Sequence, residues 1–203
     1  MRAPFRVSPR SILAALTLAL AVPVLAWTSS AELLTLQPES RLWVDGTSSI
    51  KAWSCKAGEV NAVVDASPNG IAQVVLGEKG VRTVRVTVPA EKMECGNGTM
   101  NEHMKKALKV GEFQTIEFKL ANYDVARGAD GVAGTLNGSL TLGGVTKQIA
   151  IPATGKSEGS ALRVTGTYPL NMKDYGLKPP TLMFGRIKVG ESVAVKFDLL
   201  LKS

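Results

Sequence analysis

The chain has 203 residues, with 24 Lys and Arg, 17 Asp and Glu, and a formal net charge of +7 at pH 7. Its basic residues are spread out, with no cluster denser than Lys105-Lys106, so the charge pattern does not predict a nucleic-acid-binding protein. The length fits one domain with a sizeable core.

The first segment has the parts of an export signal. Three arginines within ten residues precede Ser11–Leu25, an apolar run without a charge, and small residues then allow cleavage after Ala26 or Ala31. An uncleaved membrane anchor is the alternative, but a run of about fifteen residues is shorter than the roughly twenty that span a bilayer. We therefore predict a signal peptide over residues 1–26, one domain over residues 32–203, and a periplasmic or secreted protein.

Two cysteines, Cys55 and Cys95, lie in the part predicted to be exported. An even number of cysteines outside the cytosol predicts a disulfide, because oxidising compartments disfavour lone exposed thiols. The bond would close a loop of about forty residues and stabilise the fold by about 3–4 kcal/mol. Two separate free thiols are the alternative reading.

After the signal, apolar and polar residues alternate with a period of two in several segments. A period of two is typical of a strand that is buried on one face and solvated on the other. In chain order, these segments are Val84–Val88, Ile116–Leu120, Leu136–Leu142, Leu162–Leu170 and Val193–Leu199. Turns rich in Gly and Pro separate them, so the series predicts an all-β protein, either an antiparallel barrel or a sandwich.

One stretch, Thr99–Lys109, departs from this period. Its methionines and Leu108 recur at helical spacing, and Thr99 with Glu102 three residues later is the pattern of a helix cap. Lysines gather at its end, where the helix dipole favours positive charge. The sequence thus predicts one short amphipathic helix inserted between strands.

The clearest hairpin in the sequence is Leu140–Lys147. Gly143-Gly144 lies between two alternating runs, and two glycines supply the positive φ angles that a two-residue turn needs. The least regular segment, Lys173–Arg186, contains Pro179-Pro180, which excludes a central strand there.

Catalytic and metal-binding groups are scarce in the sequence. His103, on the predicted helix, is the sole histidine, whereas a zinc site normally has three or four His, Cys or carboxylate ligands. His103 could serve as the base of a Ser-His-acid triad, but no serine has the sequence setting of a nucleophile. We predict a protein that is not an enzyme and that uses no metal or cofactor.

Four segments resemble, in order, the motifs of the YceI-like family of exported bacterial lipid-binding proteins. They are Trp43–Trp53, Asn101–Phe118, Gly134–Lys147 and Lys188–Phe197. The third is the most recognisable, with a Leu-rich strand that turns on Gly-Val-Thr-Lys. The four segments extend over nearly all of the chain beyond the signal.

The resemblance implies a lipocalin-like, eight-stranded antiparallel barrel that holds a long isoprenoid or other linear lipid in its interior. Once the signal is removed, we expect no stable membrane insertion. Ser48 stands where the family often has His, and Gln114 where it often has Pro. The cysteine pair is not part of the family motif.

The expected lining of the barrel follows from the alternation of side chains along each strand, because every second residue points inward. The candidate ligand-binding residues are Val84, Val86, Val88, Ile116, Phe118, Leu140, Leu142, Ile149, Val164 and Phe197. The same residues would equally form the ordinary core of a filled barrel, because eight strands can enclose either side chains or one ligand. The leading hypothesis is a lipid carrier or sequestering protein, and the rival is an envelope interaction or stress module with a filled barrel.

Overall fold

The structure is a computed structural model that describes residues 31–182, 184 and 186–203, so the predicted signal segment lies outside the described residues. The strands are β1 (Glu32–Leu36), β2 (Arg41–Thr47), β3 (Ala52–Ala57), β4 (Asn61–Ala66), β5 (Val81–Pro89), β6 (Met93–Glu94), β7 (Thr115–Gly128), β8 (Gly131–Leu142), β9 (Val145–Glu158), β10 (Ala161–Asn171), β11 (Thr181–Leu182), β12 (Ile187–Lys188) and β13 (Ser192–Lys202). The helices are α1 (Gly70–Val75) and α2 (Gly98–Ala107), with 3₁₀ turns at Ala90–Lys92 and Met172–Tyr175.

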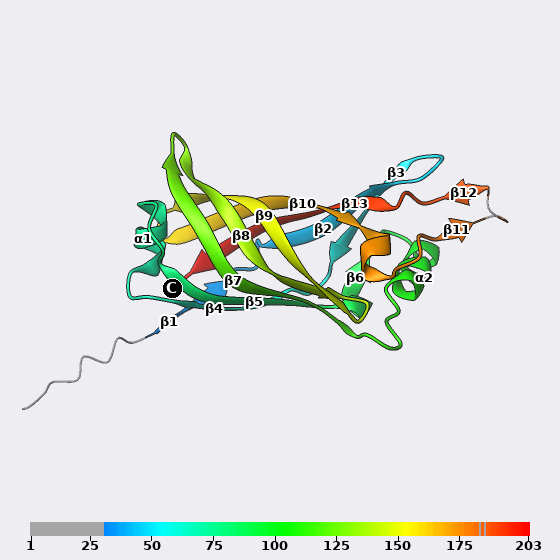
Figure 1. The fold of residues 1–203 in the computed structure, drawn as a ribbon, viewed down its shortest axis with the longest axis horizontal. Coiled ribbons are helices and arrows are strands. Elements are labelled where there is room, and N and C mark those ends of the chain that lie inside the picture. The colour runs from blue at the N-terminus through cyan, green and yellow to red at the C-terminus, as the bar shows by residue number, and fades with distance from the viewer. Residues whose placement is uncertain (1–30, 183, 185) are drawn as a thin grey trace, which may run out of the picture.

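The strands close into an antiparallel barrel (Figure 1). Three of the barrel strands are interrupted: β1 continues as β2, β3 as β4, and β5 as β6 after a 3₁₀ turn. β1 pairs with β4 and β2 with β3, while β13 pairs with both β1 and β2 and so completes the ring. Pro38, Gly58 and Pro89 occur at these interruptions, as expected for residues that lack a backbone donor or weaken a strand. The predicted eight-stranded barrel is confirmed.

The Gly-Gly hairpin is also confirmed. Leu142 pairs with Val145, and the φ angles of Gly143 and Gly144 are 55° and 81°. Both angles are left-handed, which matches the right-handed twist of the flanking strands.

Both ends of the barrel carry a helix (Figure 1). α2 lies where the sequence predicts it, and Lys105 and Lys106 fall in its last turn. The predicted cap at Thr99 is wrong, because Asn97 is the capping residue and its side chain accepts a hydrogen bond from the Met100 N–H at 2.8 Å. Asn97 can do this because its own backbone is extended, whereas Thr99 is already helical.

The sequence pattern does not predict α1. Its residues are rich in β-branched side chains, which favour strands, and the preceding Pro-Asn-Gly indicates only a turn. The helix forms because tertiary packing overrides this preference: Val74 is buried against Val132 and Leu162 at the end of the barrel. Gly70 and Gly80 also bring the start of α1 against the start of β5, since a Cβ on either glycine would overlap the backbone of the other.

Replacing Gly80 with Ala is therefore expected to lower the free energy of unfolding by about 1–3 kcal/mol, because the added methyl group overlaps backbone that cannot move independently. Urea unfolding measures this loss. Gly98→Ala is the matched control, because a Cβ at Gly98 meets no atom within 4 Å and helical alanine is favourable. Equal stabilities of the two variants would contradict the close approach of α1 to β5.

Cys55 and Cys95 form a disulfide with an S–S distance of 2.04 Å, as predicted. The bond joins β3 to the segment that precedes α2, and both cysteines are buried in the apolar cluster at that end of the barrel. Neither cysteine is free, so the alternative of two separate thiols is excluded.

Candidate ligand cavity

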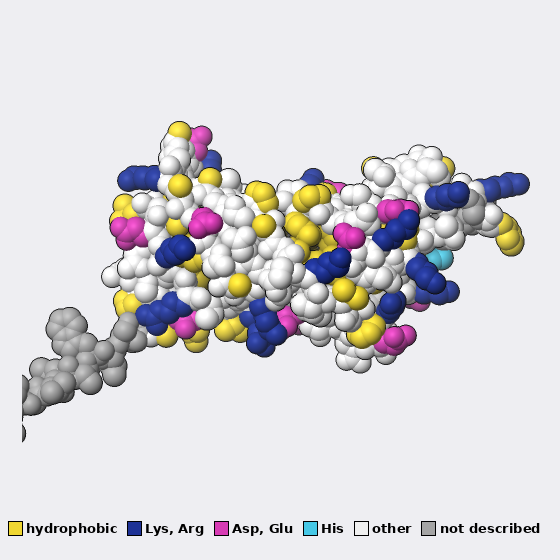
Figure 2. All heavy atoms as spheres, viewed as in Figure 1, with side chains coloured by type: hydrophobic (Ala, Val, Ile, Leu, Met, Phe, Trp, Pro, Cys, Tyr) yellow, Lys and Arg dark blue, Asp and Glu magenta, His cyan; other side chains and the backbone are white. Residues whose placement is uncertain are grey.

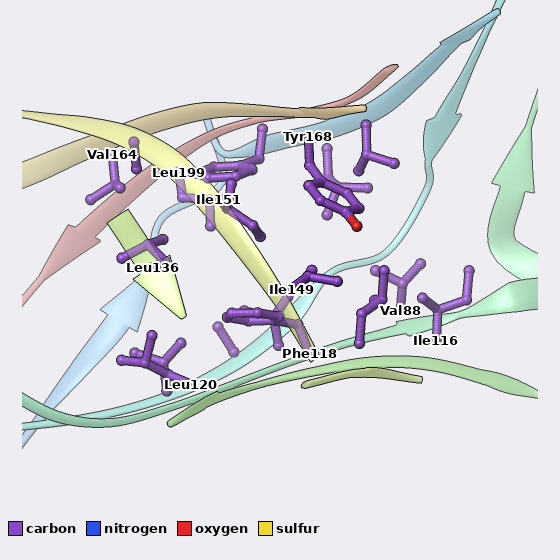
Figure 3. A pocket seen from close by; sticks show the side chains of 18 of the residues that line it. Val88, Ile116, Phe118, Leu120, Leu136, Ile149, Ile151, Val164, Tyr168 and Leu199 are labelled. Atoms are coloured by element: carbon purple, nitrogen blue, oxygen red, sulfur yellow. The ribbon is translucent and has the colours of Figure 1, made fainter. Parts of the chain in front are cut away.

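The three clusters of buried side chains lie at the two ends of the barrel. One cluster surrounds the disulfide and Leu108, next to α2. Two smaller clusters lie near α1, around Val64 and Leu162. Between them, Phe118, Leu136 and Leu199 point inward but are only half-buried (Figure 3). Inward side chains that remain accessible indicate an empty space rather than a packed core.

A cavity of about 270 Å³ occupies this space. Its lining extends from Val74 in α1 to Met104 in α2, so the cavity follows the long axis of the barrel. Its volume is near the lower end of the roughly 300–1,000 Å³ usual for small-molecule sites. A small volume spread over the length of a barrel describes a narrow channel, which suits a linear molecule better than a compact one.

All ten residues predicted to face the interior line this cavity. They are Val84, Val86, Val88, Ile116, Phe118, Leu140, Leu142, Ile149, Val164 and Phe197. Their contact with a ligand stays a prediction. Leu120, Leu136 and Leu199 also line the cavity. Each lies at one end of an alternating segment identified in the sequence and has the same parity as the predicted set, so the parity argument applies to them as well.

Other lining residues carry no signal of this kind in the sequence. Met93, Leu177 and Val74 come from a two-residue strand, a loop and α1, respectively. They reach the cavity only because the fold brings these segments to the barrel ends.

Two inward glycines make room for aromatic rings in the cavity wall. A Cβ at Gly138 would lie 2.8 Å from Cζ of Phe118, and a Cβ at Gly166 would overlap the ring of Phe197. Both glycines occupy inward positions that hold large side chains elsewhere on their strands. Without these glycines, the two rings would be displaced toward the barrel axis and would narrow the channel.

The lining is almost entirely hydrocarbon, and its few polar groups are mostly engaged. The Tyr123 hydroxyl accepts a hydrogen bond from the Val81 N–H at 3.0 Å. The Tyr168 hydroxyl points into the cavity (Figure 3). Burial, and next the neighbouring Tyr168, raise the pKa of Tyr175 well above its usual value, so the Tyr175 hydroxyl is neutral at physiological pH. Such a cavity can hold a long apolar chain.

The wall is thin beside the turn between β2 and β3. Trp53 and Val193 line both the cavity and a groove on the outside of the barrel. The indole N–H of Trp53 donates to the Thr47 carbonyl oxygen at 3.1 Å, and the ring packs over Gly46, where a Cβ would overlap it. At this point the cavity is separated from the surface mainly by one aromatic side chain.

Among the described residues that line the cavity, Asp124 is the one charged side chain. Within the described residues, no group of three or more His, Cys, Asp or Glu side chains could hold a metal ion. His103 is half-buried on α2 and is not among the lining residues. In the same part of the chain, no helix is both long and apolar enough to cross a bilayer.

The sequence of this chain matches a known protein family. A family model described as the YceI-like domain matches residues 44–201. The chain belongs to the YceI-like family. Among curated relatives, a UPF0312 protein of Shewanella sp. strain W3-18-1 is 33% identical over 104 residues, which are 47% of this chain and 53% of that protein. The chain thus spans about half the length of the curated relatives it matches.

Solved structures share the fold of this YceI-like chain. BcnA of Burkholderia cenocepacia superposes with a TM-score of 0.63 at 15% identity, over 79% of this chain and 95% of that one. A polyisoprenoid binding domain from Saccharophagus degradans, implicated in plant cell wall breakdown, superposes with a TM-score of 0.60 at 13% identity, over 85% and 99% of the two chains. At these identities the likeness establishes the barrel architecture alone.

Ser48, which departs from the YceI-like motif, does not line the cavity. Its hydroxyl donates to the Lys51 carbonyl oxygen at 2.8 Å within the turn between β2 and β3. The departure therefore falls on a surface turn.

Proposed function

We propose that this chain binds one long-chain amphiphile, a polyisoprenoid or a similar lipid, in the barrel cavity. The observation that carries the proposal is the narrow, hydrocarbon-lined channel between two packed ends. Burying each methylene group contributes about 0.8 kcal/mol, so a long chain binds tightly with few polar contacts. A fold neighbour described as a polyisoprenoid binding domain supports the same ligand class.

The cellular role that we propose is that of an exported carrier or sequestering protein, formed by one domain over residues 32–203 after removal of residues 1–26. The buried Cys55–Cys95 disulfide supports export, because disulfides persist mainly outside the cytosol. The ten inward residues identified from the sequence are the proposed ligand contacts. The role that we propose is non-catalytic, and a cavity lined mainly by aliphatic side chains supports binding of an apolar ligand.

Native lipid extraction tests this proposal. The protein is purified without strong detergent, and its extract is analysed by mass spectrometry for a stoichiometric long-chain lipid. Purified protein is then incubated with added polyprenols and its uptake is measured. We expect either a co-purified lipid or saturable uptake. If neither occurs, the carrier function is wrong and a filled-barrel interaction module becomes the better description.

A further inference from the structure

Two surface turns at the α2 end of the barrel form one unit. Residues 47–51 join β2 to β3, and the described part of residues 178–190 contains β11 and β12 (Figure 1). The Ser49 N–H donates to the Lys188 carbonyl oxygen at 2.9 Å, and the Ser49 hydroxyl accepts from the Lys188 N–H at 3.2 Å. We call this unit the tip. These bonds hold the two turns in a fixed relation at the extremity of the molecule.

The tip carries positive charge without any compensating negative charge. Residues 47–51 and 178–190 contain four cationic residues and no Asp or Glu. The cations are Lys51, Lys178, Arg186 and Lys188, and none of them forms an ion pair with another described residue. Figure 2 shows Lys and Arg side chains gathered at this extremity.

Two large apolar side chains project from the same unit. Ile50 is 64% exposed, and Phe184 is completely exposed. Ile50 directly precedes Lys51, and Phe184 lies two residues before Arg186. Exposure of single apolar side chains is common. Here, two of them project from a unit whose charged residues are all cationic, and this combination fits a partner that is anionic at its surface and apolar inside.

The opposite end of the barrel differs in charge. Leu33 and Leu76 are exposed there, but Leu33 pairs across the strands with Asp65, and Gly77, Glu78 and Lys79 follow Leu76. Apolar side chains at that end therefore lie among charges of both signs, and an anionic surface would repel the acidic ones. At the tip, by contrast, the two segments that carry the protruding apolar side chains contain cationic residues and no acidic residue.

We propose that the tip docks reversibly on an anionic lipid bilayer, with Ile50 and Phe184 inserted among the headgroups and the four cations bound to lipid phosphates. Cations beside shallowly inserted aromatic and aliphatic groups are the pattern of interfacial membrane binding. A protein partner would need a broad contact surface, whereas two projecting side chains need only a fluid apolar layer. The tip includes Thr47, which accepts the Trp53 indole hydrogen bond, so docking would place the thin part of the cavity wall beside the membrane.

Vesicle sedimentation tests the proposal with the purified protein. Vesicles contain equal parts of phosphatidylglycerol and phosphatidylcholine, and control vesicles contain phosphatidylcholine alone. We expect binding to the anionic vesicles that weakens as salt is raised, because salt screens exposed charges. Each cation near an anionic surface contributes about a fivefold gain in partitioning. Reversing Arg186 and Lys188 to Glu should therefore weaken binding by at least about 25-fold.

The matched control reverses Lys156 and Lys202 to Glu, which changes the net charge equally but at the α1 end. We expect this variant to bind within about twofold of the original chain, since its altered sites lie far from the tip. Phe184→Ser should weaken binding without changing the charge. Equal losses in the two charge variants, no effect of Phe184→Ser, or binding to an acidic protein but not to vesicles would overturn the proposal. Vesicle binding is measured without a cavity ligand, so its failure is distinguishable from a failure of lipid uptake.

Discussion

The variant Ala153→Trp is expected to reduce lipid uptake by at least about 100-fold while the barrel remains folded. Ala153 lines the middle of the cavity and pairs with Gly134 on one side and Gly166 on the other. An indole there would block the channel between its two ends. Excluding about four methylene groups, at about 0.8 kcal/mol each, corresponds to a loss of roughly 200-fold in affinity. Titration with a fluorescent polyprenol or fatty acid analogue measures the loss.

The same strand offers a matched control. Ala150 lies on β9 three residues earlier, faces outward and is exposed. Ala150→Trp introduces the same side chain on the outer surface, so we expect uptake within about twofold of the original protein. Equal uptake by both variants would show that the channel does not hold the ligand. A strong loss in Ala150→Trp would instead place the ligand on the outside of the barrel.

The inward face of the barrel could be predicted from the sequence because side chains alternate between the two faces of a strand, and this alternation is a local property. Once a strand is recognised, its register fixes which side chains share a face, so Val84 and Val86 or Leu140 and Leu142 point inward together. The Gly-Gly turn could be predicted for a similar reason, since its conformation depends on two adjacent residues. The disulfide followed from the number of cysteines and the predicted compartment.

Other features depend on contacts between distant segments. α1 exists because Val74 finds a buried position against Val132 and Leu162, and no pattern within its own six residues indicates this. The hollow middle of the barrel is equally non-local. It depends on where Phe118 lies relative to Gly138, which belongs to the next strand. Periodicity identifies an inward face, but it cannot show whether facing side chains meet across the axis.

Removing the disulfide with Cys55→Ala and Cys95→Ala is expected to lower the free energy of unfolding by about 4 kcal/mol. The cysteines are separated by 40 residues, and the entropy of closing a loop of this length in the unfolded chain gives about that value. Urea unfolding under oxidising conditions measures the change. The bond also holds the segment before α2 against β3, so we expect faster release of a bound lipid past Met104 and Leu108 in the double variant.

The single variants separate the crosslink from the packing of the cysteine side chains. Either Cys55→Ala or Cys95→Ala alone breaks the bond, so each single variant should lose nearly as much stability as the double variant. A reductant should destabilise the original protein to the same level and leave the double variant unchanged. If the two single losses instead add to give the double loss, or if the reductant affects both proteins equally, the stabilisation comes from core packing and not from the covalent loop. In that case, α2 would be held over the barrel end by apolar contacts around Met93 and Leu108, and lipid release would not depend on redox conditions.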